Sequence, residues 1–575
     1  MTLDLSRIFK AYDIRGVVPD ELDASVARGV GAAFARFTGA SRILIGRDMR
    51  ASGTELSAAF AEGATGEGAA PTPQALHDLV HRRGEECLLV MSGHHHRDHR
   101  PHPAPTTVAT MGGGPTTGPV TLDLSRIFKA YDIRGVVPDE LDASVARGVG
   151  AAFARFTGAS RVLMGRDMRA SGTELSAAFA EGATGEGADV VDLGLISTDL
   201  AYFAAGSLDA PAAMLTASHN PAHYNGIKLC LPGARPVGQD TGLADIQAMV
   251  ERGLEPEEGT VTGSVSTLDL LGEFGDHVRS FVDRSVLRPL TVVADAGNGM
   301  GGLVAPEVFK GLPFDVEMMY AELDGTFPNH PPDPIQPENL EDLQSRVLEV
   351  GADVGLAFDG DADRVFLVDD QAQPLSGSTT TAMVAAALLE KHPGGTILYN
   401  LICSKAVPEV VTEKGGTPVR TRVGHSFIKS VMAETGAIFG GEHSGHYYFA
   451  DNFRADSGII AALVVLELLS KAEQPLSELR TPFERYAASG EINVTVDDPQ
   501  AVVERVADAY KGAEQERVDG LTVDSGDWWF NLRASNTEPV LRLNLEAADP
   551  ESCQAHVAEV RSLMSGDSDS DPGDQ

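Results

Sequence analysis

Hydrophobic and polar positions follow two alternating periodicities over most of the chain after residue 121. Val145, Val149 and Phe153 recur at helical spacing, whereas residues 161–165 and 190–196 are short apolar runs typical of strands. Because strands and helices alternate, the pattern predicts α/β layers with mainly parallel strand pairing.

Other segments continue the same pattern. Ser171 is placed to cap a helix that contains Leu175 and Phe179. The apolar run 458–466 is too short to cross a bilayer and predicts a buried helix. Further strands are expected at residues 212–215, 354–358, 365–368 and 395–399, and residues 290–299 are expected to be a strand that runs into a Gly-rich turn.

The character of the chain changes after residue 484. The pattern predicts a helix at 501–510 and strands at 492–496, 521–529 and 540–545. These elements predict a smaller α+β domain at the C-terminal end of the chain.

The N-terminal part of the chain is a near-identical copy of a later segment. Residues 2–69 reappear as residues 121–188 at a constant offset of 119. A single close pair is unlike a solenoid, which has three or more diverged repeats. We interpret it as a recent tandem duplication or an assembly error. The two differences are Ile43, which becomes Val162, and Ile45, which becomes Met164.

The alignment of the copies suggests where the original gene began. Met1 aligns with Val120, and a GTG codon is read as Met at a start and as Val inside a gene. We therefore expect Val120 to be the original start of a unit of 456 residues. Residues 70–120 hold seven of the 16 His and seven Pro, so we expect a disordered linker, with metal binding as the alternative.

Charge and composition limit the classes of partner. The chain of 575 residues has 45 Lys and Arg against 83 Asp and Glu, a net charge of −38. Nucleic acid and anionic membrane are therefore excluded as partners. The four Cys have no paired spacing, which argues against a disulfide framework or zinc ribbon. The charged N-terminus has no signal-peptide core, so we predict a cytoplasmic protein.

Three aspartates alternate in a short loop between two predicted strands. Asp359, Asp361 and Asp363 can converge on one hard cation through oxygen. An EF-hand would need Gly in place of Arg364 and Glu in place of Asp370, so a dedicated calcium loop is excluded. We predict a Mg²⁺ site with a phosphate as a further ligand; the alternative is a solvated acidic turn.

Two more loops carry candidate reactive groups. Ser218 follows a strand, where it would be exposed for nucleophilic or phosphoryl chemistry, and Lys228 could neutralise developing charge. Glu442, Ser444 and His446 are two residues apart, so in an extended segment they share one side and suit sugar hydroxyls. His446 is also a candidate for proton transfer. The alternatives are an ordinary turn serine, a surface lysine and a polar turn.

A fourth loop has the groups of a phosphate clamp. It combines a guanidinium, hydroxyls and an amide in Arg533, Ser535, Asn536 and Thr537. A chain with a charge of −38 needs a local basic island to bind an anion. The candidates for that island are Arg533, Arg364, Lys228, Arg166 and Arg169.

In this order the motifs resemble the α-D-phosphohexomutase superfamily, and within it the bacterial phosphomannomutase/phosphoglucomutase group. Residues 128–135, 165–172 and 327–334 are similar to further segments of the family, and the resemblance covers 121–565. It implies three related mixed α/β domains plus a smaller C-terminal α+β domain around a central cleft.

With the resemblance, the chain divides into seven expected segments. They are a partial duplicate of the first domain (1–69), a His/Pro-rich linker (70–120), domain 1 with the serine loop (121–265), domain 2 with the metal loop (266–374), domain 3 with the sugar-recognition loop (375–485), domain 4 with the phosphate-binding loop (486–565) and an acidic, disordered tail (566–575).

The resemblance also implies an activity. Such an enzyme is an isomerase that interconverts hexose 6-phosphate and hexose 1-phosphate, of mannose and also glucose, through a hexose 1,6-bisphosphate. Its partners would be small sugar phosphates, and it would be a monomer or a dimer. By matching positions, Ser218 would be the phosphoserine, and Asp359, Asp361 and Asp363 would hold Mg²⁺ together with it.

The remaining roles follow from the same resemblance. Arg364 would lie at the transfer site, while Lys228 and His446 would move protons or stabilise charge. Substrate contacts are implied for Tyr131, Arg134, Glu442, Ser444, Arg533, Ser535, Asn536 and Thr537.

One residue departs from the family pattern, and two alternatives remain open. Ile402 stands where some relatives have a basic residue, which puts contacts from that segment in doubt. Phosphoglucosamine mutase is one alternative, although His443 is more similar to mannose/glucose-type members. The other is a non-catalytic sugar-phosphate-binding product impaired by the duplicated N-terminus.

Overall fold

The structure is a computed structural model that divides into two compact units, residues 1–117 and 118–575. It describes Arg28 and residues 42–45, 70–73, 86–89, 124–254, 260–496, 498–534 and 540–565.

The strands described in the first unit form a parallel sheet. β1 (Arg42–Ile45) pairs with β2 (Ala70–Pro73) on one side and with β3 (Glu86–Leu89) on the other. β2 and β3 lie within residues 70–120, where we expected a linker. For these eight residues the expectation of disorder is wrong.

The sheet of the first unit repeats a pairing of the second. In the first unit Arg42 pairs with Ala70, and in the second Arg161 pairs with Asp189. Both partners differ by the offset of 119 that separates the two copies. The duplicated strand β1 therefore pairs in the same register as β5, although its partner β2 lies just beyond the copied residues 2–69.

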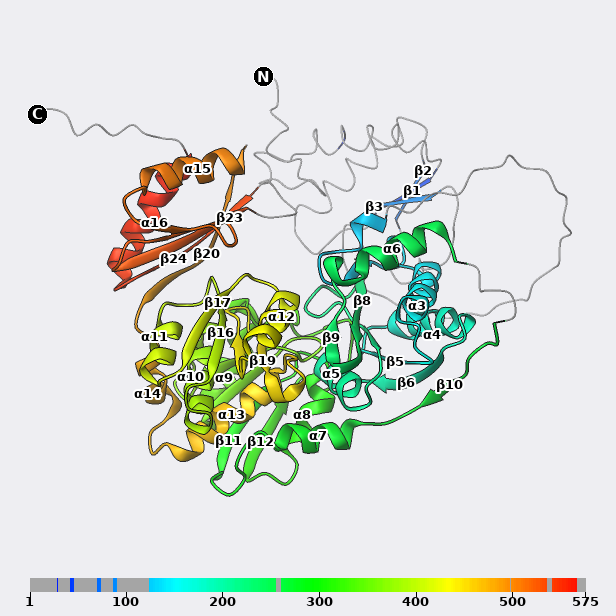
Figure 1. Ribbon diagram of the computed structural model, residues 1–575, viewed down its shortest axis with the longest axis horizontal. Coiled ribbons are helices and arrows are strands. Elements are labelled where there is room, and N and C mark those ends of the chain that lie inside the picture. Colours follow the sequence, from blue (N-terminus) through cyan, green and yellow to red (C-terminus); the bar gives the residue numbers. More distant parts are fainter. Residues whose placement is uncertain are drawn as a thin grey trace, which may run out of the picture. The chain divides into compact units, whose positions relative to one another are not determined.

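The first sheet of the second unit is mixed. Its order is β10-β6-β5-β7-β8-β4, with β9 beside β8 (Figure 1). The first four strands are parallel, but β8 and β4 are antiparallel, so pairing is less uniformly parallel than predicted. The strands are β4 (Ile133–Val136), β5 (Arg161–Arg166), β6 (Asp189–Leu195), β7 (Ala212–Leu215), β8 (Tyr224–Leu231), β9 (Arg235–Pro236) and β10 (Val265–Thr267).

Helices cover both faces of this sheet. Val162 and Met164 of β5 share a buried cluster with α3 and α4, whereas Leu163 between them packs with α5. This is the alternation of a strand covered on both sides. The helices are α3 (Ala143–Thr157), α4 (Gly172–Gly185), α5 (Thr198–Ser207) and α6 (Leu243–Arg252).

Ser171 stands immediately before α4, but its side chain does not cap the helix as expected. Its hydroxyl instead accepts a hydrogen bond of 2.9 Å from Asn225 Nδ2. The predicted position is therefore correct, whereas the predicted capping interaction is wrong.

The second sheet carries the aspartate loop at its centre. Its order is β12-β11-β13-β14-β15, and the antiparallel pair β13–β14 is joined by residues 359–364. The strands are β11 (Leu290–Asp295), β12 (Phe314–Met319), β13 (Val354–Phe358), β14 (Val365–Asp369) and β15 (Pro374–Leu375). The helices are α7 (Leu271–Arg279), α8 (Gly301–Phe309) and α9 (Glu341–Val350).

The third sheet has the order β17-β16-β18-β19. Its strands are β16 (Thr396–Asn400), β17 (Thr417–Thr421), β18 (Phe439–Gly441) and β19 (Tyr447–Phe449). Its helices are α10 (Gly377–Lys391), α11 (Ala406–Glu413), α12 (His425–Thr435), α13 (Gly458–Lys471) and α14 (Leu476–Leu479). One apolar cluster runs through all three α/β domains and includes Leu163, Leu356 and most of α13. The predicted burial of α13 is confirmed.

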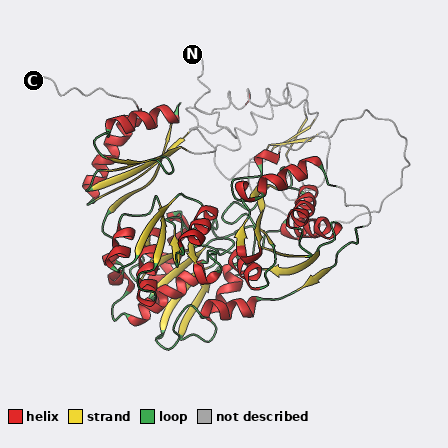
Figure 2. Cartoon of the chain, viewed as in Figure 1, coloured by secondary structure: helices red, strands yellow, loops and turns green. Residues whose placement is uncertain are grey.

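The C-terminal domain is an antiparallel sheet with two helices packed against it (Figure 2). Its strand order is β20-β24-β23-β22-β21. The single strand predicted at 521–529 is wrong, because a turn at 525–527 divides it into β22 and β23. The elements are β20 (Ala487–Thr495), α15 (Pro499–Ala509), β21 (Glu514–Glu516), β22 (Leu521–Asp524), β23 (Trp528–Ala534), β24 (Val540–Ala547) and α16 (Pro550–Ser565).

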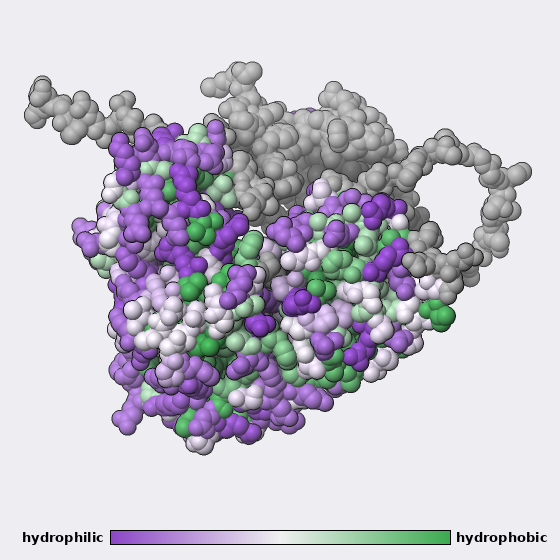
Figure 3. All heavy atoms as spheres, viewed as in Figure 1, coloured by the Kyte–Doolittle hydropathy of each residue, from purple (hydrophilic) through white to green (hydrophobic). Residues whose placement is uncertain are grey.

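The predicted fold class, three α/β domains and a smaller α+β domain, is confirmed. On the face shown in Figure 3, hydrophilic side chains predominate over the C-terminal domain, in keeping with the net charge of −38. Among the described residues, none of the helices combines the length and apolar character needed to cross a membrane.

Candidate active site

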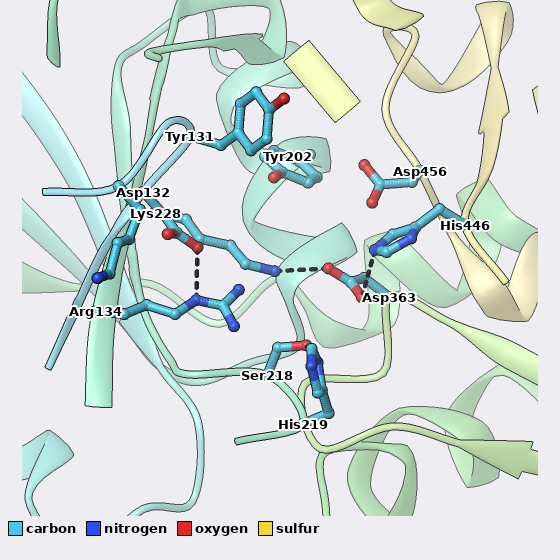
Figure 4. Close-up of a pocket in the computed structure, with 11 residues that line it drawn as sticks. Tyr131, Asp132, Arg134, Tyr202, Ser218, His219, Lys228, Asp363, His446 and Asp456 are labelled. Carbon is cyan, nitrogen blue, oxygen red and sulfur yellow. Dashed lines mark hydrogen bonds and ion pairs between the residues drawn. The ribbon is translucent and has the colours of Figure 1, made fainter. Parts of the chain in front are cut away.

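A cavity of about 300 Å³ gathers polar side chains from separate parts of the second unit (Figure 4). Six of its lining residues were predicted: Tyr131, Arg134, Ser218, Lys228, Asp363 and His446. Five were missed: Lys129, Asp132, Tyr202, His219 and Asp456. Lys129 and Asp132 stand in the family-like segment 128–135 and His219 follows Ser218, but no role had been predicted for them, whereas Tyr202 and Asp456 stand in segments without a recognised motif.

Ser218 lies at the centre of this site, in the loop between β7 and β8. Its Oγ donates a hydrogen bond of 2.8 Å to Asp359 Oδ2 and is 3.3 Å from His219 Nδ1. We expected an exposed serine, but its exposed fraction is only 3%. Its φ of 50° is in the left-handed region, which a residue with a side chain rarely adopts.

The three aspartates of the β13–β14 turn converge beside Ser218. They offer carboxylate oxygens that all lie within 4.8 Å of one another, and all three residues are buried. Lys228 Nζ donates to Asp361 Oδ2 at 2.8 Å and to Asp363 Oδ2 at 2.7 Å. Thr198 Oγ1 donates a third hydrogen bond, of 2.6 Å, to Asp361 Oδ2.

The aspartate cluster fits a hard divalent cation. Asp361 Oδ1 and Asp363 Oδ1 are buried and have no hydrogen-bond partner. Burial, reinforced by the charges of the other two aspartates, raises the pKa of Asp359 well above its usual value, against the pull of Arg364. Unpaired buried carboxylate oxygens are costly without a cation. Oxygen-only donors of this kind suit Mg²⁺.

Lys228 remains an ammonium in this environment. Burial favours the neutral amine, but Asp361 and Asp363 outweigh it and raise the pKa of Lys228 well above its usual value. The residue can therefore stabilise negative charge, but it cannot accept a proton while both carboxylates face it.

His219 is neutral for the opposite reason. Burial lowers its pKa to about 2, and the charges of Arg364 and Arg134 act in the same direction. The positive charges of Arg364 and Arg134, which act on His219, would also attract an anion next to Ser218.

Arg364 joins the aspartate loop to the serine. Its backbone N–H and its Nε donate to Asp359 Oδ1 and Oδ2 at 3.1 and 3.0 Å. Its NH2 group is buried and has no hydrogen-bond partner. A buried guanidinium donor without an acceptor, close to Ser218 and Asp359, suits a phosphoryl oxygen.

The segment 442–446 is a tight turn between β18 and β19, so the extended row that we expected is wrong. The three predicted side chains meet nonetheless. His446 Nδ1 lies 3.1 Å from Ser444 Oγ and 3.7 Å from Glu442 Oε2. Glu442 is buried and also accepts a 2.7 Å hydrogen bond from Tyr448.

The predicted phosphate clamp is only partly described. Arg533 lies at the end of strand β23 rather than in a loop, and it does not line the cavity. Its guanidinium is 3.6 Å from Asp519 and 3.9 Å from Glu491. Ser535, Asn536 and Thr537 lie outside the described residues.

The basic island differs from the expected one. Arg166 and Arg169 do not line the cavity, because Arg166 faces Asp192 at 3.9 Å and Arg169 is engaged by the serine loop. The lining cations are instead Lys129, Arg134 and Lys228. An acidic chain thus collects its positive charge at one polar cavity beside a buried carboxylate cluster.

A buried serine, a carboxylate cluster that could hold a cation and a basic cavity are together typical of proteins that handle phosphate groups. Sequence models of one family match the chain along its length. The Phosphoglucomutase/phosphomannomutase models match residues 6–95 and 125–257 (alpha/beta/alpha domain I), 272–373 (domain II), 376–486 (domain III) and 491–563 (C-terminal domain).

Individual relatives agree with this match. A phosphomannomutase of Salmonella montevideo is 40% identical over 448 residues, which are 76% of this chain and 98% of the relative. A protein named phosphohexose mutases from Xanthomonas campestris is 40% identical over 444 residues, 76% and 99% of the two chains. The chain belongs to the phosphoglucomutase/phosphomannomutase family.

A solved structure supports the same assignment. A phosphoglucomutase/phosphomannomutase family protein from Burkholderia thailandensis is 33% identical, with a TM-score of 0.70 over 77% of this chain and 98% of that one. The chain is therefore an isomerase of the phosphohexomutase type. The domain I match from residue 6 extends to residue 95, past the end of the near-identical copy and over both β2 and β3.

Proposed function

We propose that this protein interconverts hexose 6-phosphate and hexose 1-phosphate, with Ser218 as the carrier of the phosphoryl group. The observation that carries the proposal is the 2.8 Å hydrogen bond from Ser218 Oγ to a buried carboxylate of the cation-binding cluster, within the basic cavity. Curated relatives named phosphomannomutase favour mannose phosphates as substrates. Glucose phosphates are proposed as second substrates.

The proposed reaction consists of two phosphoryl transfers, one from Ser218 Oγ and one back to it. In the first, the P–O bond to Ser218 Oγ breaks while a new P–O bond forms to a free hydroxyl of the sugar phosphate; this hydroxyl loses its proton and Ser218 Oγ takes one up. The product is a hexose 1,6-bisphosphate. After it turns over in the cavity, its other phosphoryl group is transferred to Ser218 Oγ, which loses its proton, and the sugar oxygen that is released takes one up.

The chain's own residues stabilise the charge of this transfer. Arg364 NH2 and the Lys228 ammonium are proposed to face the phosphoryl oxygens, where preformed donors act strongly in a buried site. His446, half-buried and 3.7 Å from Asp363, is proposed to exchange the proton of the sugar hydroxyl. Glu442 and Ser444 would hold sugar hydroxyls from the adjoining turn.

Asp359, Asp361 and Asp363 are proposed to hold Mg²⁺ together with the phosphoryl group on Ser218. The bound ion would offset the negative charge that spreads over the phosphoryl oxygens. Arg533, Ser535, Asn536 and Thr537 are proposed to bind the phosphate that does not react. Tyr131 and Arg134 would line the entrance, since both border the cavity.

The proposal is tested by locating the phosphate. Intact-mass measurement and peptide mapping of the purified protein should find one phosphate, on Ser218, and Ser218→Ala should lack it and lose turnover. Ser444→Ala is a matched control, because it should keep the phosphate on Ser218. An active enzyme without phosphate on Ser218 would contradict the proposed carrier.

The preferred sugar is a separate question with a separate assay. Turnover should be compared on mannose, glucose and glucosamine phosphates with the 1,6-bisphosphate present as activator. Fastest turnover of the glucosamine substrate would identify a phosphoglucosamine mutase. Binding of sugar phosphates without turnover of any would favour a non-catalytic product.

A further inference from the structure

Arg169 is a buried arginine in the loop between β5 and α4, outside the cavity. Its side chain has an exposed fraction of 0%, as has that of Asp167 beside it. Asp167 accepts hydrogen bonds from Arg169 N at 2.9 Å and from Arg169 Nε at 3.2 Å. The pair is thus electrically balanced within the domain, and the guanidinium is fixed in orientation.

The remaining four N–H groups of Arg169 all point at the serine loop. NH2 donates to the carbonyl oxygens of Ser218 and Asn220 at 2.8 and 2.6 Å. NH1 donates to those of Pro221 and Tyr224 at 2.8 and 3.0 Å. All five donors of one planar guanidinium are therefore used, four of them on one loop of seven residues.

The serine loop needs such support because its backbone is strained where the nucleophile stands. Ser218 has a φ of 50°, a left-handed conformation that costs on the order of 1 kcal/mol or more unless the surroundings impose it. Thr216 Oγ1 accepts a 2.9 Å hydrogen bond from Ser218 N. Arg169 holds the carbonyl of the same residue, so both peptide groups of Ser218 are fixed.

Residues of the neighbouring domain pack against Arg169 and the serine loop. The ring of Phe327 lies 5.1 Å from Arg169 Cζ, and a Cβ at Gly325 would lie 2.6 Å from Arg169 Cα. A Cβ at Gly360, between two of the aspartates, would lie 2.5 Å from the carbonyl oxygen of Ser218. The serine loop is therefore packed tightly between Arg169 and the aspartate loop.

We propose that Arg169 is a positioning residue that aims Ser218 Oγ at the phosphoryl group and at the aspartate cluster. This inference rests on the proposed function of Ser218. A lysine at the same place would keep the charge, but its three donors leave from one atom and cannot span four carbonyls and Asp167. Geometry rather than charge is the property that Arg169 supplies.

The test compares Arg169→Lys with wild type in the full-length enzyme. Misplacing a reacting group by about 1 Å costs on the order of 100-fold in rate, so we expect kcat to fall by about that factor while KM stays unchanged. The rate is expressed per molecule that carries phosphate on Ser218, counted by intact mass. Thr216→Val removes the support of Ser218 N and also the hydrogen bond between Thr216 and Asp167, the partner of Arg169, so it should lower kcat in the same way, and Thr216→Ser should restore it.

Arg279→Lys is a matched control for loss of a buried arginine. Arg279 likewise donates to two carbonyls, Glu307 O at 2.5 Å and Val308 O at 3.2 Å, but at the end of α8 and away from the site. It should lower the melting temperature without changing kcat per phosphorylated molecule. If Arg169→Lys and Arg279→Lys behave alike, Arg169 is structural only and the inference is overturned. Failure of the proposed function is distinct, because it would leave wild type without phosphate on Ser218.

Discussion

Removing the ammonium group of Lys228 tests most directly whether the aspartate cluster binds a cation. In Lys228→Met, Asp361 and Asp363 lose the cation that lies 2.8 and 2.7 Å from them, and both carboxylate side chains are at most 1% exposed. Removing one partner of a buried ion pair costs about 3–5 kcal/mol, because the other charge stays buried and unpaired. We expect the variant to be destabilised by about that amount in EDTA.

A divalent cation should then restore the stability that is lost with the ammonium group. Binding to the folded state adds about 2.7 kcal/mol when the free ion is at about 100 times its dissociation constant. Because the ammonium no longer competes for two of the three carboxylates, Mg²⁺ should bind the variant more tightly and stabilise it more than wild type. The assay is the melting temperature as a function of Mg²⁺ concentration, followed by circular dichroism.

Lys391→Met is the matched control for this experiment. Lys391 Nζ lies 2.6 Å from Glu467 Oε2, a buried carboxylate that belongs to neither candidate metal-binding group among the described residues. Lys471 Nζ stays 3.0 Å from Glu467 Oε1, so the loss of stability should be smaller than in Lys228→Met. The control should be destabilised, but Mg²⁺ should not restore it. The reasoning is refuted if Lys228→Met is as stable as wild type in EDTA, or if Mg²⁺ stabilises both equally.

Three further predictions follow from other features. Burial raises the pKa of Asp199 to about 7, so its contribution to the free energy of unfolding should fall by about 1.4 kcal/mol per unit as pH rises from about 4 to 7. In urea unfolding, the loss of stability with pH should be smaller by that amount in Asp199→Asn than in wild type. Arg533→Gln should raise KM for the sugar phosphate by about 10- to 100-fold with a smaller effect on kcat, as for a lost hydrogen bond to a charged group; an unchanged KM would remove Arg533 from the phosphate site. A chain that starts at Val120 should keep the kcat of the full chain, because every cavity-lining residue lies after residue 124; a large gain would show that residues 1–119 interfere.

Local sequence signals predicted the fold well where each element carries its own pattern. The strand predicted at 212–215 is β7, and the helical spacing from Val145 is α3. Strand direction was less predictable. β8 follows β7 after a loop of eight residues and pairs with it in antiparallel direction. The periodicity within a strand does not indicate the direction of the neighbouring strand.

The site was predictable only where several chemical groups stand together in sequence. The aspartate triplet, Ser218 and the turn around His446 could be recognised because each is a compact motif. Tyr202 and Asp456 could not be recognised. Tyr202 borders the cavity because of how α5 packs, and Asp456 does so because it forms a β-bridge with Tyr448 of β19. Arg169 was placed in the wrong role, since the carbonyls that it binds are fixed only by the fold.

The two strands β1 and β5 also decide how experiments on this chain can be read. Both differences between the copies lie in these strands, at alternate positions, and Val162 and Met164 face the same buried cluster. Trypsin would release Ile43–Arg47 from one copy and Val162–Arg166 from the other, while neighbouring peptides have identical sequences. Tryptic hydrogen-exchange or labelling data on residues 127–169 can therefore be assigned to one copy only through this strand, and Met164 is a mass label that its counterpart lacks.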